Sequence, residues 1–144
     1  MSAKIKNYTS SVPASRTISL IELELVKIGV THIEKSYDMG EANGIIFSIT
    51  MGKKFSFKLP AKILEAYDII KLIPEYKNKK VEWLEAQARR TAWKIILNWV
   101  EAQVAMIQLN QAEAMQIFMP YIYDSKSGQT FYEKIRDNNF KLLE

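Results

Sequence analysis

The sequence predicts an α+β fold in which a small three-stranded antiparallel sheet packs on a long central helix, with short helices flanking them. Two observations support this prediction. Apolar residues recur at helical spacing near the start of the chain and again over residues 81–109. Between these stretches, three segments rich in β-branched and aromatic residues are separated by turn residues, a pattern typical of short antiparallel strands. The predicted element order is α-β-β-β-α-α-α-α.

The first helix is expected over residues 16–28. Ser15 is the candidate N-cap, because its hydroxyl can accept a hydrogen bond from a free backbone N–H. Gly29 follows the last periodic residue and can end the helix, since glycine tolerates a positive φ.

Three strands are expected, within residues 30–37, 45–50 and 54–59, and a short hairpin with Gly52 joins the last two. Successive residues of a strand point to opposite faces of the sheet. The third strand alternates strictly, so that one face carries Phe55, Phe57 and Leu59 and the other carries Lys54, Ser56 and Lys58. The second of these faces must meet solvent or a partner.

A second helix is expected over 61–72, and the longest helix over 81–109. The long helix has apolar residues on two stripes, one through Trp93 and Val100 and the other through Trp99. A helix that is apolar on two sides is usually covered on both. Either the C-terminal elements cover the second stripe, or that stripe forms the interface of a homodimer.

Short elements are expected to end the chain: a helix over 112–118, an extended segment over 121–123, a turn over 124–128 and a helix over 130–138. Thr130 and Glu133 have the spacing of a capping box at the start of the last helix.

Composition narrows the function. The 144 residues include 20 Lys and Arg, 16 Asp and Glu, one His and no Cys. The absence of Cys excludes thiol catalysis and cysteine-based metal sites, and the single His excludes any site with two imidazoles. A chain of this length needs no disulfide or metal to be stable. We therefore expect a flexible leader over 1–11 and a single α+β domain over 12–144.

Membrane and targeting signals are not apparent. No apolar run approaches the ~20 residues that span a bilayer, and the first 15 residues lack the apolar region of a signal peptide. The absence of Cys agrees with a reducing compartment. These observations predict a cytoplasmic protein without a membrane partner.

The positive charge is concentrated in the middle of the chain. Residues 50–100 hold eleven basic and five acidic side chains, whereas the segments before and after them are neutral and acidic. A basic segment can bind polyanions, or it can be a solvated surface that keeps the protein soluble. The candidate nucleic-acid-binding residues are Lys54, Lys58, Lys77, Lys79, Lys80, Arg89, Arg90 and Lys94.

Aromatic residues add one candidate contact. Trp93 and Trp99 lie on the apolar stripes of the long helix and are expected in the core. Trp83 lies near the start of that helix, beside the basic connector, and could stack on a base or anchor a partner protein.

Catalytic and metal sites are not expected. His32 and Glu34 can share one strand face and could do acid–base chemistry, but no nucleophile or metal motif accompanies them. The carboxylates in the turns around Asp38 and Asp124 do not follow the EF-hand pattern. The phosphate-loop, dinucleotide-binding, zinc-protease and hydrolase motifs are also missing from the sequence. The sequence therefore predicts a protein that is not an enzyme and that has no cofactor and no metal.

Several short segments of the sequence are distinctive. The most specific are Arg90-Thr91-Ala92-Trp93 and Trp99-Val100-Glu101-Ala102-Gln103. The others are Val12-Pro13 with Thr17-Ile18, Phe57-Lys58-Leu59-Pro60, Phe118-Met119-Pro120-Tyr121, and Gly128-Gln129-Thr130-Phe131-Tyr132-Glu133. Together they resemble a family of small uncharacterised proteins that tailed phages and prophages encode, and the resemblance covers roughly residues 12–133. It implies a phage or mobile-element origin and says little about mechanism.

The residues and the resemblance together lead to two functional hypotheses. The first is a non-enzymatic phage-type binding protein that acts on nucleic acid, or on nucleic-acid machinery, through its basic middle segment. The alternative is a host-takeover or counter-defence inhibitor that binds a bacterial protein or a nucleotide signal. Both place the protein in the cytoplasm of a bacterial host.

Overall fold

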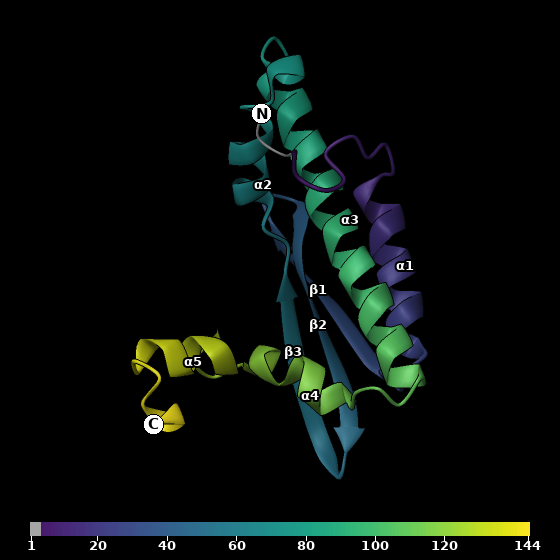
Figure 1. Cartoon of the computed structure of the whole chain (residues 1–144), viewed down its shortest axis with the longest axis vertical. Coiled ribbons are helices and arrows are strands. Elements are labelled where there is room, and N and C mark those ends of the chain that lie inside the picture. Colours follow the sequence, from purple (N-terminus) through teal and green to yellow (C-terminus); the bar gives the residue numbers. More distant parts are fainter. Residues whose placement is uncertain (1–3) are drawn as a thin grey trace. The chain divides into compact units, whose positions relative to one another are not determined.

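The computed structural model describes residues 4–144 and has the predicted α+β class, with its antiparallel three-stranded sheet and its element order confirmed. Figure 1 traces the elements along the chain. The helices are α1 (Ala14–Val26), α2 (Ile63–Ile70), α3 (Val81–Gln108), α4 (Ala114–Phe118) and α5 (Phe131–Asp137). The strands are β1 (His32–Asp38), β2 (Glu41–Met51), β3 (Lys53–Pro60), β4 (Tyr123–Asp124) and β5 (Gln129–Thr130). Short 3₁₀ helices are η1 (Pro74–Tyr76), η2 (Met119–Tyr121) and η3 (Lys141–Leu143).

The described chain forms two compact units, where the sequence predicts one domain. The first, called here the helical unit, combines the described residues up to Glu24 with Ala61–Ala102. The second, the sheet unit, combines Leu25–Pro60 with Gln103–Glu144. Each is described by itself.

Helix α1 starts earlier than predicted. The backbone N–H groups of Arg16 and Thr17 both donate to the carbonyl of Pro13, so Ser15 lies inside the first turn and the prediction that it is the N-cap is wrong. Proline fixes φ near −65°, a value that suits the start of a helix, and Pro13 therefore decides where α1 begins. The prediction for Gly29 is confirmed: its φ is +91°, and its N–H donates to the carbonyl of Val26 at 3.2 Å.

The sheet unit is built on the antiparallel order β1-β2-β3 (Figure 1). Gly52, with a φ of +79°, occupies the tight turn between β2 and β3. On one face of the sheet Phe47 and Phe57 are completely buried, with ring centroids 5.3 Å apart, and Phe118 of α4 packs against both rings. This aromatic cluster is the core beneath the sheet.

A short continuation of the sheet lies at the free edge of β3. Phe57 forms an antiparallel bridge with Ile122, the residue that precedes β4. The chain then turns back after β4 through residues 125–128, so that β5 pairs with β4, and Thr130 at the end of β5 is the N-cap of α5. The capping box of Thr130 and Glu133 is confirmed, with both reciprocal hydrogen bonds present.

The helical unit packs α2 against the first half of α3 (Figure 1). Its apolar cluster joins Ala66, Ile70 and Ile73 to Leu84 and Ala88. Further along α3, the first predicted stripe is buried at Trp93, Leu97, Val100 and Val104. The second stripe is less covered, with Ile96 and Trp99 half-buried and Met106 exposed.

The described part of the predicted flexible leader, residues 4–11, contacts α3. Thr91 donates its hydroxyl to the carbonyl of Asn7 at 3.1 Å, and the Gln87 amide donates to the carbonyls of Tyr8 and Ser10 at 2.7 and 3.0 Å. These bonds connect the segment to the helix. The first three residues of the leader lie outside the described part of the chain.

Candidate functional site

The second face of the sheet, opposite the phenylalanines, is polar and carries a cleft. Strand alternation places His32 and Glu34 of β1 on the same face as Ile46 and Ser48 of β2, and as Lys54 and Ser56 of β3. These six residues, with Ile33, Tyr123 and Ser125, line a cleft of about 350 Å³. A volume of this size is at the lower end of the range for small-molecule sites.

A row of polar residues crosses the middle of the cleft. His32 lies opposite Ser48 in the register of β1 and β2, and Ser48 lies opposite Ser56 in that of β2 and β3. The two serine hydroxyl oxygens are 3.0 Å apart and share a hydrogen bond. Each hydroxyl has one hydrogen, so this bond uses one and leaves the other free to donate. Tyr123, from the strand that bridges to β3, also lines the cleft.

His32 adds a second polar group to this row. Its Nδ1 is 3.0 Å from the hydroxyl of Thr31. In the tautomer in which Nδ1 accepts that hydrogen, Nε2 carries a hydrogen and can donate to a ligand.

The two ends of the cleft carry opposite charges. Lys54 lies one row from Ser48 and Ser56 along the strands, while Glu34 lies one row away in the other direction, opposite Ile46. Successive rows are about 7 Å apart, because two residues of an antiparallel strand rise by that distance. The cleft is therefore cationic at one end, rich in hydroxyls in the middle, and acidic with an apolar floor at the other end.

Lys58 belongs to the same sheet face but has a different contact. Its ammonium nitrogen is 5.2 Å from the centre of the Tyr123 ring, the geometry of a cation–π interaction. It does not line the cleft and lies beside it, on the β3 side.

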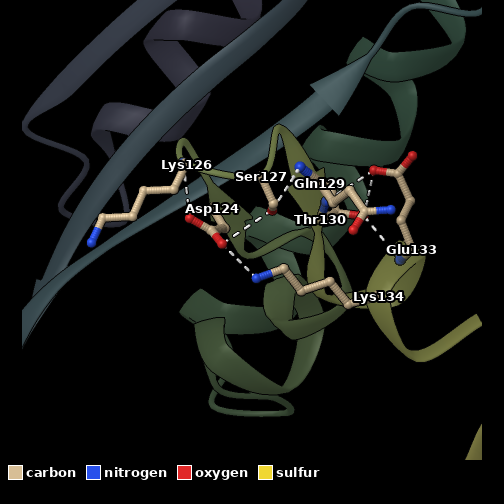
Figure 2. Close-up of polar contacts among 7 residues, drawn as sticks. All are labelled: Asp124, Lys126, Ser127, Gln129, Thr130, Glu133 and Lys134. Carbon is tan, nitrogen blue, oxygen red and sulfur yellow. Dashed lines mark hydrogen bonds and ion pairs between the residues drawn. The ribbon is translucent and has the colours of Figure 1, made fainter. Parts of the chain in front are cut away.

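The turn that carries Ser125 is fixed by a network of hydrogen bonds, which Figure 2 shows. The carboxylate of Asp124 accepts from the ammonium of Lys134 at 2.5 Å, the N–H of Lys126 at 3.0 Å and the hydroxyl of Ser127 at 3.1 Å. These contacts, that of Lys134 foremost, lower the pKa of Asp124 to about 2. Its negative charge is thus paired with the ammonium of Lys134 on α5.

The start of α5 is fixed in the same way (Figure 2). Glu133 accepts from the N–H of Thr130 at 2.9 Å and donates its own N–H to the Thr130 hydroxyl at 3.3 Å. The hydrogen bond from the Thr130 backbone is the main cause of a lowered pKa of Glu133. The β4–β5 hairpin and α5 are therefore joined by side-chain hydrogen bonds.

The eight candidate basic residues are distributed over both units. Lys54 and Lys58 lie in the sheet unit, and the other six lie in the helical unit. Lys77, Lys79 and Lys80 are exposed in the connector before α3.

The three basic residues on α3 are half-buried: Arg89, Arg90 and Lys94. Arg90 donates from Nε to the carbonyl of Ser10 at 3.2 Å and also hydrogen bonds to the side chain of Gln87. It therefore helps to hold the leader.

Trp83 is half-buried in the helical unit. Its ring meets that of Tyr76 edge-on, with centroids 4.8 Å apart, and the ammonium of Lys79 lies 4.8 Å from the centre of the Trp83 ring. Trp83 also packs against the apolar cluster of α2 and α3.

Some residues of the cleft were predictable from the sequence, and others were not. His32, Glu34, Lys54 and the polar face of β3 were recognisable from strand alternation. Ser48 follows the same alternation on β2. Its side chain is almost buried, with 6% of its surface exposed. Tyr123 and Ser125 come from a distant segment, and periodicity gives no signal that they join the sheet.

Comparisons with known proteins add no relative: no family model, curated protein or solved structure matches the chain. Among residues 4–144, no three His, Asp or Glu side chains gather in a way that could hold a metal ion. In the same residues, no helix is both long and apolar enough to cross a membrane.

Proposed function

We propose that this chain is a non-enzymatic nucleic-acid-binding protein and that the polar face of the sheet unit binds a single strand. The observation that supports it most is the composition of that face. It brings together two lysines of β3, an imidazole, three serine hydroxyls and a tyrosine ring around one cleft.

A single strand suits such a surface better than a duplex does. Single strands bind to positively charged surfaces that track the backbone, and their bases stack on aromatic side chains. Lys54 and Lys58 would contact phosphates along β3, and Tyr123 beside them would contact a base. Sequence preference should be weak, because stacking and phosphate contacts do not read base edges.

A binding role is also favoured over catalysis by the partners of the serines. A serine nucleophile needs a base within hydrogen-bond reach. The Ser48 hydroxyl bonds to Ser56, and the hydrogen bond of the His32 ring is to Thr31. Neither serine is therefore hydrogen bonded to the imidazole, the base that could activate it.

The test is fluorescence anisotropy with labelled single-stranded RNA, single-stranded DNA and duplex DNA at two salt concentrations. We expect both single strands to bind more tightly than duplex. Each phosphate contact on a single strand lowers the slope of log affinity against log salt by about 0.7. Two lysine contacts should therefore give a slope near −1.4 or steeper.

Charge-reversed variants locate the surface. Lys54→Glu and Lys58→Glu should weaken binding and flatten the salt slope, whereas Lys141→Glu, an exposed residue of η3 off the sheet, should change both much less. A dissociation constant above about 100 μM at low salt, or equal losses in all three variants, would reject the proposal. Lys77→Glu and Lys80→Glu measure how much the exposed lysines of the helical unit contribute to the affinity for nucleic acid.

A second candidate is binding to a protein, which in a phage setting would be a bacterial host protein. It is favoured by exposed apolar side chains on and after α2: Leu64 and Leu72 are 76% exposed and Ile69 is 48% exposed. Exposed apolar side chains of this kind can mark a protein interface. A partner that binds the native chain and is lost with Leu64→Ser and Leu72→Ser, while Lys54→Glu has no effect, would favour this function.

A further inference from the structure

We propose that the cleft of the sheet unit binds a nucleoside 5′-monophosphate, either free or as the 5′-terminal nucleotide of a strand. The phosphate would lie over the central row of the cleft, and the ribose would lie over the row of Glu34. This inference deepens the proposed function and rests on it for the strand form of the ligand.

The central row has the donors that a phosphate needs. Phosphate monoesters carry close to two negative charges and three strong acceptor oxygens at neutral pH. The Ser48 and Ser56 pair has one hydroxyl hydrogen left to donate, and Nε2 of His32 can supply a second donor. Lys54, one row away, and Ser125 line the same cleft.

The acidic end of the cleft fits a sugar. A carboxylate accepts two hydrogen bonds at once, which matches the neighbouring 2′- and 3′-hydroxyls of a ribose. Glu34 lies about 7 Å along the strand from the central row, comparable to the separation of a 5′-phosphate from the ribose diol. Ile46, opposite Glu34, gives an apolar floor for the sugar.

The position of Glu34 also distinguishes the 5′ from the 3′ isomer. In a 3′-monophosphate the doubly charged phosphate is on the carbon next to the 2′-hydroxyl, so a carboxylate that binds that hydroxyl would face both charges, whereas a strand has only a singly charged diester there. A 5′-phosphate is separated from both hydroxyls by the ring. The carboxylate of Asp124, which is next to Ser125 in the sequence, is paired with Lys134. Its negative charge therefore does not oppose a phosphate bound at the central row.

The row of Glu34 also indicates where a bound nucleic-acid strand would leave the cleft. Lys58 lies on β3 opposite Ile46, on the far side of it from Glu34. A 5′-terminal nucleotide with its 2′-hydroxyl on Glu34 would direct its 3′-oxygen, and hence the next phosphate, toward Lys58. The 2′-hydroxyl contact predicts a preference for RNA over DNA.

The experiment uses the full chain and two sets of probes. The first set is an 8-nucleotide RNA with a 3′ label, carrying either a 5′-phosphate or a 5′-hydroxyl, together with the matching DNA. The second set is adenosine 5′-monophosphate, adenosine 3′-monophosphate, adenosine and inorganic phosphate, measured by calorimetry. We expect the 5′-phosphate to improve RNA affinity about tenfold, and the 5′-monophosphate to bind more tightly than the other three small ligands.

Three variants separate the contacts. Lys54→Met should remove the preference for a 5′-phosphate. Glu34→Gln should reduce the preference for RNA over DNA and leave the effect of the 5′-phosphate intact. Lys58→Met should weaken both RNAs by the same factor, and the control Lys141→Met should match the native chain in all measurements.

The outcomes separate this inference from the proposed function. Strand binding with no 5′-phosphate preference and no binding of the 5′-monophosphate would overturn the inference and keep the proposed function. Binding of the free 5′-monophosphate that Lys54→Met abolishes, without strand binding, would uphold the cleft and overturn the strand function. Equal binding of the 5′- and 3′-monophosphates would overturn the assigned orientation, and no binding of any probe would overturn both proposals.

Discussion

Two polar clusters of this protein use similar side chains in different ways. In the helical unit, Gln87, Arg90 and Thr91 form what we call the leader clamp, and their polar atoms bond to backbone carbonyls of residues 7–10 and to one another. In the sheet unit, the polar row around Ser48 lines a cleft and keeps hydrogens that can be donated. A polar cluster whose bonds are satisfied within the chain stabilises the fold, and one that keeps donors toward a cleft is a candidate site.

The basic residues differ in the same way as the two clusters. Arg90 and Lys54 are both cations of the basic middle segment, and the sequence does not separate them. The guanidinium of Arg90 is engaged with Ser10 and Gln87, whereas Lys54 is exposed at the edge of a cleft. Variants of the clamp should therefore change stability, and variants of the cleft should change binding.

The largest effect on stability is expected from the core beneath the cleft. Phe57 is fully buried against two other phenylalanine rings, so Phe57→Ala should lower the free energy of unfolding by about 3–5 kcal/mol. Urea denaturation followed by tryptophan fluorescence measures it. Phe57→Leu, which keeps most of the volume, should cost less than about 1.5 kcal/mol. A loss below 1 kcal/mol for the alanine variant would show that the aromatic cluster does not support the sheet.

The leader clamp should give the next largest effect. Gln87 is 3% exposed, and Gln87→Leu would remove its hydrogen bonds to two leader carbonyls, each of which keeps a second donor, and would remove an acceptor of the half-buried Arg90 guanidinium. We expect the free energy of unfolding to fall by about 1–3 kcal/mol, the range for hydrogen bonds lost around a partly buried charged group. Gln108→Leu, at an exposed position of the same helix, should stay within about 0.5 kcal/mol. RNA affinity should be unchanged in both, and a Gln87→Leu variant that lost binding alone would break the distinction between clamp and cleft.

The capping box of α5 should contribute less to the free energy of unfolding. Thr130→Ala removes the hydroxyl that accepts the N–H of Glu133, which should cost about 1 kcal/mol in the same urea experiment. Thr130→Ser keeps the oxygen and should retain most of the stability. Equal losses in the two variants would mean that the methyl group, and not the cap, is what matters at this position.

The smallest effect is the dependence of the β4–β5 turn on pH. The folded-state pKa of Asp124, about 2, is below its ordinary value of 3.8, so the charged carboxylate favours the folded state. This contribution is complete above about pH 3.8 and is lost as the pH falls toward 2. NMR titration of the carboxyl carbon should give this low midpoint in the native chain and a higher one in Lys134→Met. The same midpoint in both would mean that the Lys134 ammonium does not cause the shift.

Local patterns were sufficient to predict much of the fold. Strand alternation gave the two faces of β3, Gly52 gave the hairpin, and the spacing of Thr130 and Glu133 gave the cap of α5. Each of these depends on residues close together in the sequence. The start of α1 was misplaced because the preference of Ser15 for an N-cap was weighed without the effect of Pro13.

The remaining features depend on contacts between distant segments. Gln87 bonds to the carbonyl of Tyr8, 79 residues away, and a backbone carbonyl carries no sequence signal. Tyr123 reaches the sheet through the bridge between Ile122 and Phe57, which no periodicity marks. The cleft was therefore only partly predictable. Its residues on β1 and β3 followed from alternation, whereas Tyr123 and Ser125 did not.

The central claim is that the polar face of the sheet unit binds a nucleic-acid strand. NMR titration of the isotope-labelled full chain with a 5′-phosphorylated 8-nucleotide RNA tests it most directly, because backbone amide shifts report the contact surface residue by residue. The account predicts that the largest shifts fall on β1, β2 and β3 around His32, Ser48 and Ser56, and on Tyr123 and Ser125. Shifts confined to the connector of Lys77–Lys80, or no shifts at millimolar RNA, would contradict it.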